Sequence, residues 1–242
     1  MENKPFTNEQ FQKIYPDGIE NHYWNHARNN IILRFLKKHG INREPILEIG
    51  GGRGVVSRFL HENLVDITGV ELAAVIPVTG TEGYFFAGTD AFSLHVDKAK
   101  RYTVIMLLDV IEHIEKPAEF IEKILQHFIG VKYILITVPA RQELWTNYDE
   151  YNGHYRRYNL ADLRHLSHGK SRLISAGYFN HVLYPVFWLY ARLIKSRETV
   201  LKAPNGWMIG VHRVLSWVLQ ADYFALPCKL PGTSVIGLIS VL

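Results

Sequence analysis

Apolar residues recur along the first part of the chain in two alternating patterns. From Tyr23 to His39 they stand at helical spacing until Gly40, and this pattern predicts a helix. Short, almost wholly apolar runs then alternate with amphipathic segments. The predicted strands cover residues 46–49, 66–70, 84–87, 102–108 and 133–138, and amphipathic helices begin at Val55 and Pro117. Apolar strands separated by helices are typical of a sheet covered on both faces, so we predict an α/β fold with a doubly wound, mostly parallel sheet.

The pattern becomes irregular beyond Pro139. Residues 141–158 are polar and aromatic, residues 160–176 favour a helix, residues 178–184 favour a strand, and residues 233–242 favour a closing strand. We find no internal repeat and no low-complexity linker. We therefore predict one domain over residues 1–242, with an N-terminal helical segment (1–44), a ligand-binding core (45–140), and an α-helical and aromatic cap with the closing strands (141–242).

Composition and charge place the chain among ordinary globular proteins. It has 242 residues, 48% hydrophobic and 21% charged, and a net charge of +4. The single cysteine, Cys228, excludes an internal disulfide, and the lack of a Cys-x-x-Cys pair argues against structural zinc. The polar first twenty residues carry no secretory signal, and residues 173–191, although free of Asp, Glu, Lys and Arg, contain Asn, His, Gly and Pro. We expect a cytoplasmic protein with no stable transmembrane span and no nucleic-acid partner.

A glycine-rich turn follows the first predicted strand, in Glu48-Ile49-Gly50-Gly51-Gly52-Arg53-Gly54. Glycines there allow positive φ and let a ligand approach the main chain. The dinucleotide pattern Gly-x-Gly-x-x-Gly is not met, because its last position falls on Val55 or Ser57, and a phosphate loop would need a lysine that residues 45–60 lack. The carboxylates of Glu48 and Asp109 would repel a pyrophosphate. A ligand that carries an ammonium and a sulfonium suits them.

Two further acids stand at or just past strand ends. Glu71 ends the second strand, where a carboxylate can accept both hydroxyls of a ribose, although it can also be a solvated acid. Asp90 can accept a hydrogen bond from an adenine amino group, with Ala91 and Phe92 beside the ring. Its alternative is a helix N-cap.

In combination, these segments resemble class I S-adenosylmethionine-dependent methyltransferases. The resemblance rests on Glu48-x-Gly50-x-Gly52-x-Gly54, Gly69-Val70-Glu71, Gly88-Thr89-Asp90-Ala91 and Asp109-Val110-Ile111-Glu112-His113-Ile114. The last segment resembles the small-molecule group of these enzymes, in which the fourth strand ends in Asp-x-x-Glu-His. The segments Gly153–Tyr158 and Trp24–Arg28 also resemble that group. The resemblance covers about residues 20–185 and departs from many members at Gly51, where they carry cysteine or another small residue. It implies a Rossmann-like methyltransferase fold.

The resemblance also implies the cofactor, S-adenosylmethionine, and the residues that hold it. These are Glu48, Gly50, Gly51, Gly52, Gly54, Glu71, Leu72, Asp90, Ala91 and Asp109. Among them the three central glycines would contact the methionine part, Glu71 the ribose, Asp90 and Ala91 the adenine, and Asp109 the ammonium. The implied chemistry is direct transfer of the methyl group to a small-molecule acceptor, and we expect the acceptor atom to be a hydroxyl oxygen.

Two histidines are candidate catalytic bases for such an acceptor. His113 and His154 qualify because an imidazole titrates near neutral pH, although either can be structural. Asp109, Glu112 and His113 together resemble metal-binding sets, yet we expect no metal, because Glu112 and His113 can equally cap the following turn. Candidate acceptor-binding residues are Trp24, Arg28, Tyr155 and Arg156. Arg156 and Arg157 suit an anionic or sugar-like acceptor, or else lie in a solvated loop and pair with Asp149 and Glu150.

The aromatic segment Tyr184–Tyr190, with Trp207 and Trp217, predicts a roof over an apolar acceptor pocket. Core packing, a dimer face, or a basic membrane contact that fits a lipid-linked acceptor are the alternatives. The expected partner is therefore a small molecule, with sugar-linked and lipid-linked acceptors both open. Two other functions also stay open, an NAD-dependent oxidoreductase, which the glycine spacing disfavours, and a non-catalytic module that binds S-adenosylmethionine.

Overall fold

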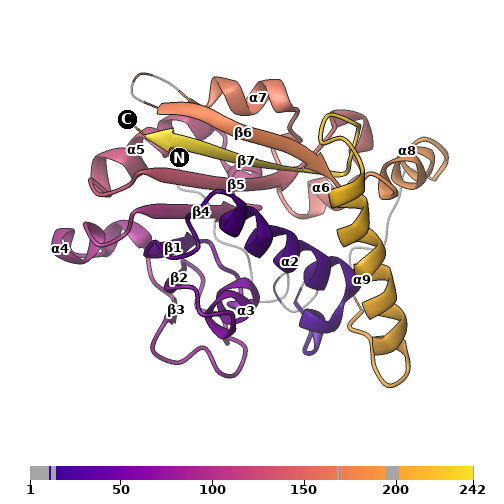
Figure 1. Ribbon diagram of the computed structural model, residues 1–242, viewed down its shortest axis with the longest axis horizontal. Helices are drawn as coiled ribbons and strands as arrows, with labels where there is room; N and C mark the ends of the chain where they lie inside the picture. Colours follow the sequence, from indigo (N-terminus) through magenta and orange to yellow (C-terminus); the bar gives the residue numbers. More distant parts are fainter. Residues whose placement is uncertain (1–10, 12–14, 168, 170, 195–201, 242) are drawn as a thin grey trace.

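The computed structural model describes residues 11, 15–167, 169, 171–194 and 202–241. Its seven strands form one sheet in the order β3-β2-β1-β4-β5-β7-β6 (Figure 1). β1 to β5 are mutually parallel where they pair, and β7 runs antiparallel to both β5 and β6. The doubly wound, mostly parallel sheet predicted from the sequence is therefore confirmed.

The elements have the following bounds. The strands are β1 Ile46–Ile49, β2 Ile67–Glu71, β3 Phe85–Ala87, β4 Val104–Leu108, β5 Tyr133–Pro139, β6 Ser171–Phe179 and β7 Ser234–Val241. The α-helices are α2 Tyr23–Lys38, α3 Val55–Glu62, α4 Val96–Ala99, α5 Pro117–His127, α6 Asn147–Tyr151, α7 Leu160–His165, α8 Leu183–Leu193 and α9 Met208–Ala225. Short 3₁₀ helices are η1 Ile19–Asn21, η2 Ala91–Ser93, η3 Ile111–His113 and η4 Gln142–Leu144.

Successive residues of the central strands face two apolar layers. In β4, Ile105 and Leu107 pack into a cluster that includes side chains of α5 and α7. Met106 and Leu108 point the other way, into a cluster with side chains of α2 and α3. This alternation follows from the period of two in a strand, and burial on both faces explains why these strands are continuous apolar runs.

The sequence prediction was wrong between residues 160 and 184. α7 ends at His165, Ser171–Phe179 form β6, and α8 begins at Leu183, so the described residues form neither a helix over 160–176 nor a strand over 178–184. β6 lies at the edge of the sheet, and exposed and less exposed residues alternate along its first half. Its strand conformation depends on pairing with β7, a segment remote in sequence.

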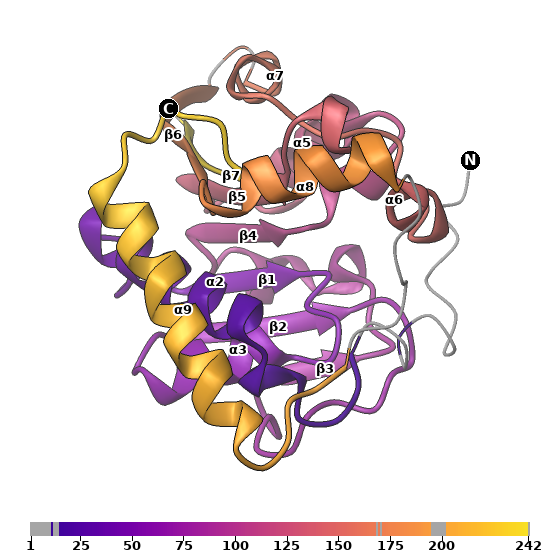
Figure 2. The same cartoon turned by 90° about the vertical axis from the view of Figure 1, so that its right-hand side faces the viewer.

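Helices α8 and α9 form the cap at one end of the sheet (Figure 2). The carboxylate of Asp222 in α9 accepts hydrogen bonds from the backbone N–H groups of His181 and Val182, at 2.7 and 3.2 Å, and so ties the two helices together. α9 also packs along α2, where Ser216 lies 2.8 Å from the Nδ1 of His26. α8 has no buried residue, so the core alternative for the aromatic segment is wrong.

The topology gathers several strand ends at one edge of the sheet. β1, β2, β4 and β5 are parallel and end there, so the residues that follow them are neighbours. β7 runs the opposite way, so its first residues lie at the same edge. In Figure 1 this edge faces α6, α8, α9 and the start of α2.

Candidate active site

The turn after β1 needs its glycines for conformation and for space. Gly50, Gly52 and Gly54 have φ angles of 76°, 59° and 81°, which L side chains adopt rarely. A Cβ atom on Gly51 would lie 2.7 Å from the Phe85 ring. The N–H groups of Gly50 and Gly51 both donate to the Val70 carbonyl, at 2.9 and 3.1 Å, which holds the turn against β2.

Two glutamates flank this turn in different ways. Glu48 is 1% exposed and accepts a hydrogen bond from the Ser57 hydroxyl, so it supports the turn from beneath. Glu71 stands beside the turn, and its two carboxylate oxygens accept the N–H groups of Gly52 and Ala73 at 2.9 and 3.0 Å. Burial raises the pKa of Glu71, and these backbone hydrogen bonds counteract part of that rise. A carboxylate has roughly four acceptor positions, so Glu71 can accept a further donor.

An ion pair lies past the end of β4. Asp109 has a φ of 56°, and its N–H donates to the Thr137 carbonyl at 2.8 Å. This backbone places the carboxylate 2.6 Å from the guanidinium of Arg28, which comes from α2. Arg28 also donates to the Thr137 hydroxyl at 3.3 Å, and its guanidinium lies 5.0 Å from the centre of the Trp24 ring. The site thus holds a fixed cation and a fixed anion side by side.

Glu112, His113 and His154 form the next corner of the site, which we call the Glu-His corner. Glu112 and His113 belong to η3, directly after β4, and His154 follows α6. The two imidazole rings lie 4.7 Å apart. Burial and the charge of Asp109 raise the pKa of Glu112 well above its ordinary value, and burial, followed by the charge of His154, lowers the pKa of His113 to about 3.

Asp149 fixes the position of His154. Its Oδ1 lies 2.9 Å from the Nδ1 of His154 and 2.9 Å from the Nε of Arg157, and its Oδ2 lies 3.0 Å from a terminal nitrogen of Arg157. Asp149 also accepts the N–H of Thr146 at 2.9 Å, as part of the capping box of α6. The alternative in which Arg157 pairs with Asp149 is therefore confirmed, although the pair is buried and not solvated.

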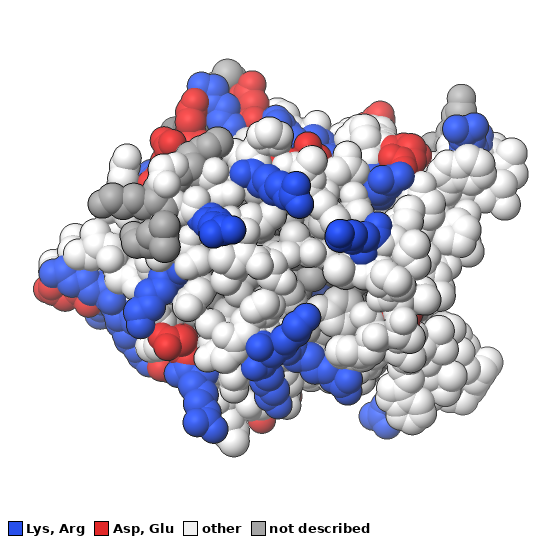
Figure 3. Space-filling view, turned by 45° about the horizontal axis from the view of Figure 1, so that its top comes forward, with Lys and Arg blue, Asp and Glu red and all other residues white. Residues whose placement is uncertain are grey.

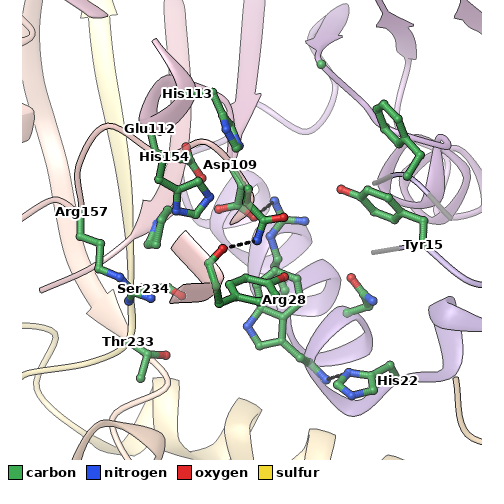
Figure 4. A pocket seen from close by; sticks show the side chains of 18 of the residues that line it. Tyr15, His22, Arg28, Asp109, Glu112, His113, His154, Arg157, Thr233 and Ser234 are labelled. Atoms are coloured by element: carbon green, nitrogen blue, oxygen red, sulfur yellow. Dashed lines mark hydrogen bonds and ion pairs between the residues drawn. The ribbon is translucent and has the colours of Figure 1, made fainter. Parts of the chain in front are cut away.

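These features surround one cavity of about 220 Å³ (Figure 4). Of the residues predicted for the site, its lining includes Trp24, Arg28, Gly50, Gly52, Glu71, Asp109, His113 and His154. The other predicted residues do not line it: Glu48, Gly51, Gly54, Leu72, Asp90, Ala91, Tyr155 and Arg156. Asp90 caps η2 through the N–H of Phe92 at 2.9 Å, as its alternative proposed, and Arg156 donates to the Glu115 carbonyl at 2.7 Å.

The cavity also contains residues that the sequence analysis did not connect with the site. They are Phe11, Tyr15, His22, Tyr23, Asn25, Pro139, Tyr148, Asn152, Thr233 and Ser234. Glu112 and Arg157, which it named as a possible metal ligand and a possible acceptor contact, line the cavity as well. Thr233 and Ser234 begin the predicted closing strand. Because that strand runs antiparallel to β5, its first residues lie beside the end of β5, at the cavity. Trp207 and Trp217, predicted to roof the pocket, are 79% and 62% exposed and do not line it. Phe187 is the part of the predicted aromatic roof that reaches the cavity.

Comparison with known proteins gives a family match. Residues 21–169 match the family model described as "Methyltransferase domain". The structure is similar to a putative sarcosine dimethylglycine methyltransferase from Galdieria sulphuraria, with a TM-score of 0.54 at 14% identity over 89% of this chain and 86% of that one. It is also similar to the plantazolicin methyltransferase BpumL in complex with a pentazolic desmethylPZN analog and SAH, with a TM-score of 0.54 at 15% identity over 90% and 85% of the two chains. No curated protein matches the sequence.

Proposed function

This chain belongs to the methyltransferase-domain family and is an S-adenosylmethionine-dependent methyltransferase, and from that membership we propose that it methylates a hydroxyl group of a small molecule. The observation that carries the proposal is the single cavity in which Glu71, the Arg28–Asp109 pair and the Glu-His corner meet. The first two suit the cofactor, and the corner suits an acceptor that must lose a proton.

The residues present fit S-adenosylmethionine. Its methionine part is a zwitterion, so Arg28 is suited to its carboxylate and Asp109 to its ammonium. Gly52 and the Tyr15 ring, both of which line the cavity, lie so close together that a Cβ on Gly52 would be 3.1 Å from the ring. Glu71 lines the cavity, where its carboxylate is suited to accept the ribose hydroxyls. We assign the adenine to the segment of Leu72, Asp90 and Ala91, which lies outside the lined cavity.

The chemistry requires an in-line approach and removal of one proton. When bound, the cofactor supplies a methyl group on sulfonium, which passes to the acceptor oxygen as the C–O bond forms and the C–S bond breaks. Arg28 and Asp109 orient the reacting end of the cofactor. Asp149 accepts from the Nδ1 of His154, which leaves the other ring nitrogen with a lone pair for the acceptor's proton. We propose that His154 is that proton acceptor and that His113 is its neighbour in the site.

Calorimetric titration with S-adenosylhomocysteine, run beside NAD under the same conditions, tests the cofactor assignment. We expect micromolar affinity for S-adenosylhomocysteine and no heat of binding with NAD, because the site lacks the dinucleotide glycine spacing. Binding of NAD alone would contradict the assignment. Binding of S-adenosylhomocysteine without turnover of any acceptor would favour the non-catalytic binding module.

The outer surface of the cap supports a lipid-linked acceptor. Val186, Leu189 and Leu193 of α8, with Trp207, Val214 and Trp217 beside or within α9, are exposed, and we call them the cap surface. In residues 181–194 and 202–230, the exposed charged side chains are cationic: Arg192, Lys202, Arg213 and Lys229. In Figure 3 the right-hand end of the molecule is mostly uncharged (white), whereas lysine and arginine side chains (blue) are spread over the rest of the visible face. Phe187 of the same helix lines the cavity. In the described residues, no helix is long and apolar enough to cross a bilayer.

Vesicle co-sedimentation tests this acceptor class. We expect the protein to pellet with vesicles of anionic phosphatidylglycerol, and a double variant, Trp207→Ser with Trp217→Ser, to lower the partition coefficient about tenfold or more, because interfacial tryptophans contribute buried apolar area. Ile129→Ser, which removes a 63% exposed apolar side chain after α5, is the matched control. Vesicle binding by the double variant equal to that of the parent would contradict the proposal. A dimer that light scattering detects for the parent and not for the double variant would also contradict it, because the cap surface would then be a dimer face.

A further inference from the structure

The Glu-His corner contains a buried carboxylate that the protein leaves without a partner. Glu112 is 1% exposed, and among the described residues neither of its carboxylate oxygens has a hydrogen-bond donor. Burying a charge or a polar group without compensation is costly, so such an oxygen pair indicates a missing positive partner. The position of the carboxylate on the cavity wall gives a partner access to it.

The neighbouring cations are already committed to other acids. Arg28 pairs with Asp109 at 2.6 Å, and Arg157 pairs with Asp149 at 2.9 Å. Among the described residues around this part of the cavity, the three acids Asp109, Asp149 and Glu112 therefore lie near two arginines. Of these three described acids, Glu112 is the one that has no arginine partner, so one positive group is missing at its carboxylate oxygens.

Two imidazoles complete a set of ligand atoms around this carboxylate. One ligand atom each from Glu112, His113 and His154 lies within 4.8 Å of the others, and Figure 4 shows the three side chains gathered on one side of the cavity. His154 is oriented by Asp149 through its Nδ1, which is the arrangement that commonly orients a metal-ligating histidine. Backbone groups of residues 152 and 153 form hydrogen bonds with His113. Both rings are thereby held in place.

We infer that Glu112, His113 and His154 bind a divalent transition-metal ion. Two imidazole nitrogens and one carboxylate suit zinc, manganese or iron(II) better than magnesium or calcium, which prefer oxygen ligands. Three protein ligands leave at least one coordination position open to the cavity. This differs from the sequence expectation of a site without metal, and it uses His154 where the sequence pattern offered Asp109, because His154 is the third residue whose ligand atom lies within 4.8 Å of those of Glu112 and His113.

The inference rests on the proposed function and narrows its acceptor to one whose hydroxyl oxygen can coordinate the ion. Coordination lowers the pKa of a bound hydroxyl, so the proton leaves to water. The resulting oxygen anion forms the C–O bond as the C–S bond breaks, and the products are the methyl ether, S-adenosylhomocysteine and one proton. In the metal-bound enzyme, His113 and His154 act as ligands, and a separate base is not required.

Competition for Zn²⁺ with a chromophoric chelator tests the site directly, using full-length protein purified without a metal-affinity tag and stripped of metal. We expect one ion per chain, and a loss of affinity of about 100-fold or more in the nearly isosteric Glu112→Gln variant and in His154→Ala, since even outer partners of such ligands change affinity 10–100-fold. His165→Ala, which removes an exposed histidine on α7, is the matched control and should bind as the parent does. Circular dichroism of each variant excludes unfolding as the cause.

Two results would overturn the inference. One is the absence of stoichiometric Zn²⁺ binding, and the other is equal affinity in the parent and in folded Glu112→Gln. Titrating the same stripped protein with S-adenosylhomocysteine separates this failure from failure of the proposed function. Retained S-adenosylhomocysteine binding without Zn²⁺ binding refutes the metal site alone, and loss of S-adenosylhomocysteine binding refutes the proposed cofactor site.

Discussion

Replacement of Glu71 by alanine is expected to weaken S-adenosylhomocysteine binding by about 100-fold or more. In the proposed complex the carboxylate accepts two ribose hydroxyls, and hydrogen bonds to a charged group contribute about 1.5–3 kcal/mol each. The same side chain also accepts the N–H groups of Gly52 and Ala73, so its loss removes one of the contacts that hold the glycine turn beside β2. Both effects reduce affinity, and calorimetric titration measures their sum.

Two further variants make this result interpretable. Glu71→Gln keeps the size of the side chain and one acceptor oxygen, so we expect its affinity to lie between those of the parent and the alanine variant. Glu122→Ala removes an exposed carboxylate from α5 and controls for the change in net charge. Unchanged affinity in a folded Glu71→Ala protein would remove Glu71 from the cofactor site.

Four of the first five strands, β1, β2, β4 and β5, were predictable because most of their residues are buried on both faces. A continuous apolar run such as Val104–Leu108 is explained by local sequence alone, since every side chain in it is buried. β6 is an edge strand in which burial alternates from Ser171 onward, and its leucine and isoleucine residues follow those of α7 closely enough to imitate helical spacing. Its conformation is decided by β7, some sixty residues later, which a local pattern does not contain.

The site residues likewise fall into those that local sequence predicts and those that tertiary packing places. Residues directly after parallel strands, such as Glu71 and Asp109, were predictable because parallel strands end at one edge of the sheet. Tyr15 and Ser234 reach the cavity from the two ends of the chain, and their placement depends on tertiary packing. Arg28 was expected near the acceptor, and its ion pair with Asp109 became evident once α2 was positioned against the end of β4. The unpartnered state of Glu112 is likewise a property of packing and not of sequence spacing.

Asp149 is the residue whose charge most strongly links the site to the stability of the fold. It has no solvent exposure, and it joins α6, His154 and Arg157, whose side chain is 8% exposed. Burial alone would raise the pKa of Asp149, but the hydrogen bond from His154 and the charge of Arg157 outweigh it and lower the pKa below the ordinary range of an aspartate. The carboxylate is therefore ionised at neutral pH. Its contribution to stability is complete above the unfolded-state pKa and is lost as the pH falls through the lower folded-state value.

The variant Asp149→Asn is expected to lower the free energy of unfolding at pH 7 by about 3–5 kcal/mol, because it leaves Arg157 buried without its counter-charge. For a chain of this size that corresponds to a fall in Tm of about 6–20 °C in calorimetry or circular dichroism. Asp97→Asn is the matched control, since Asp97 is 77% exposed and pairs with His95 and Lys100 at the surface, where such pairs contribute less than about 1 kcal/mol. The difference between Asp149→Asn and the parent should shrink below about pH 4, as the parent loses the charge that the variant lacks. A Tm equal to that of the Asp97→Asn control at pH 7 would show that the buried pair does not stabilise the fold.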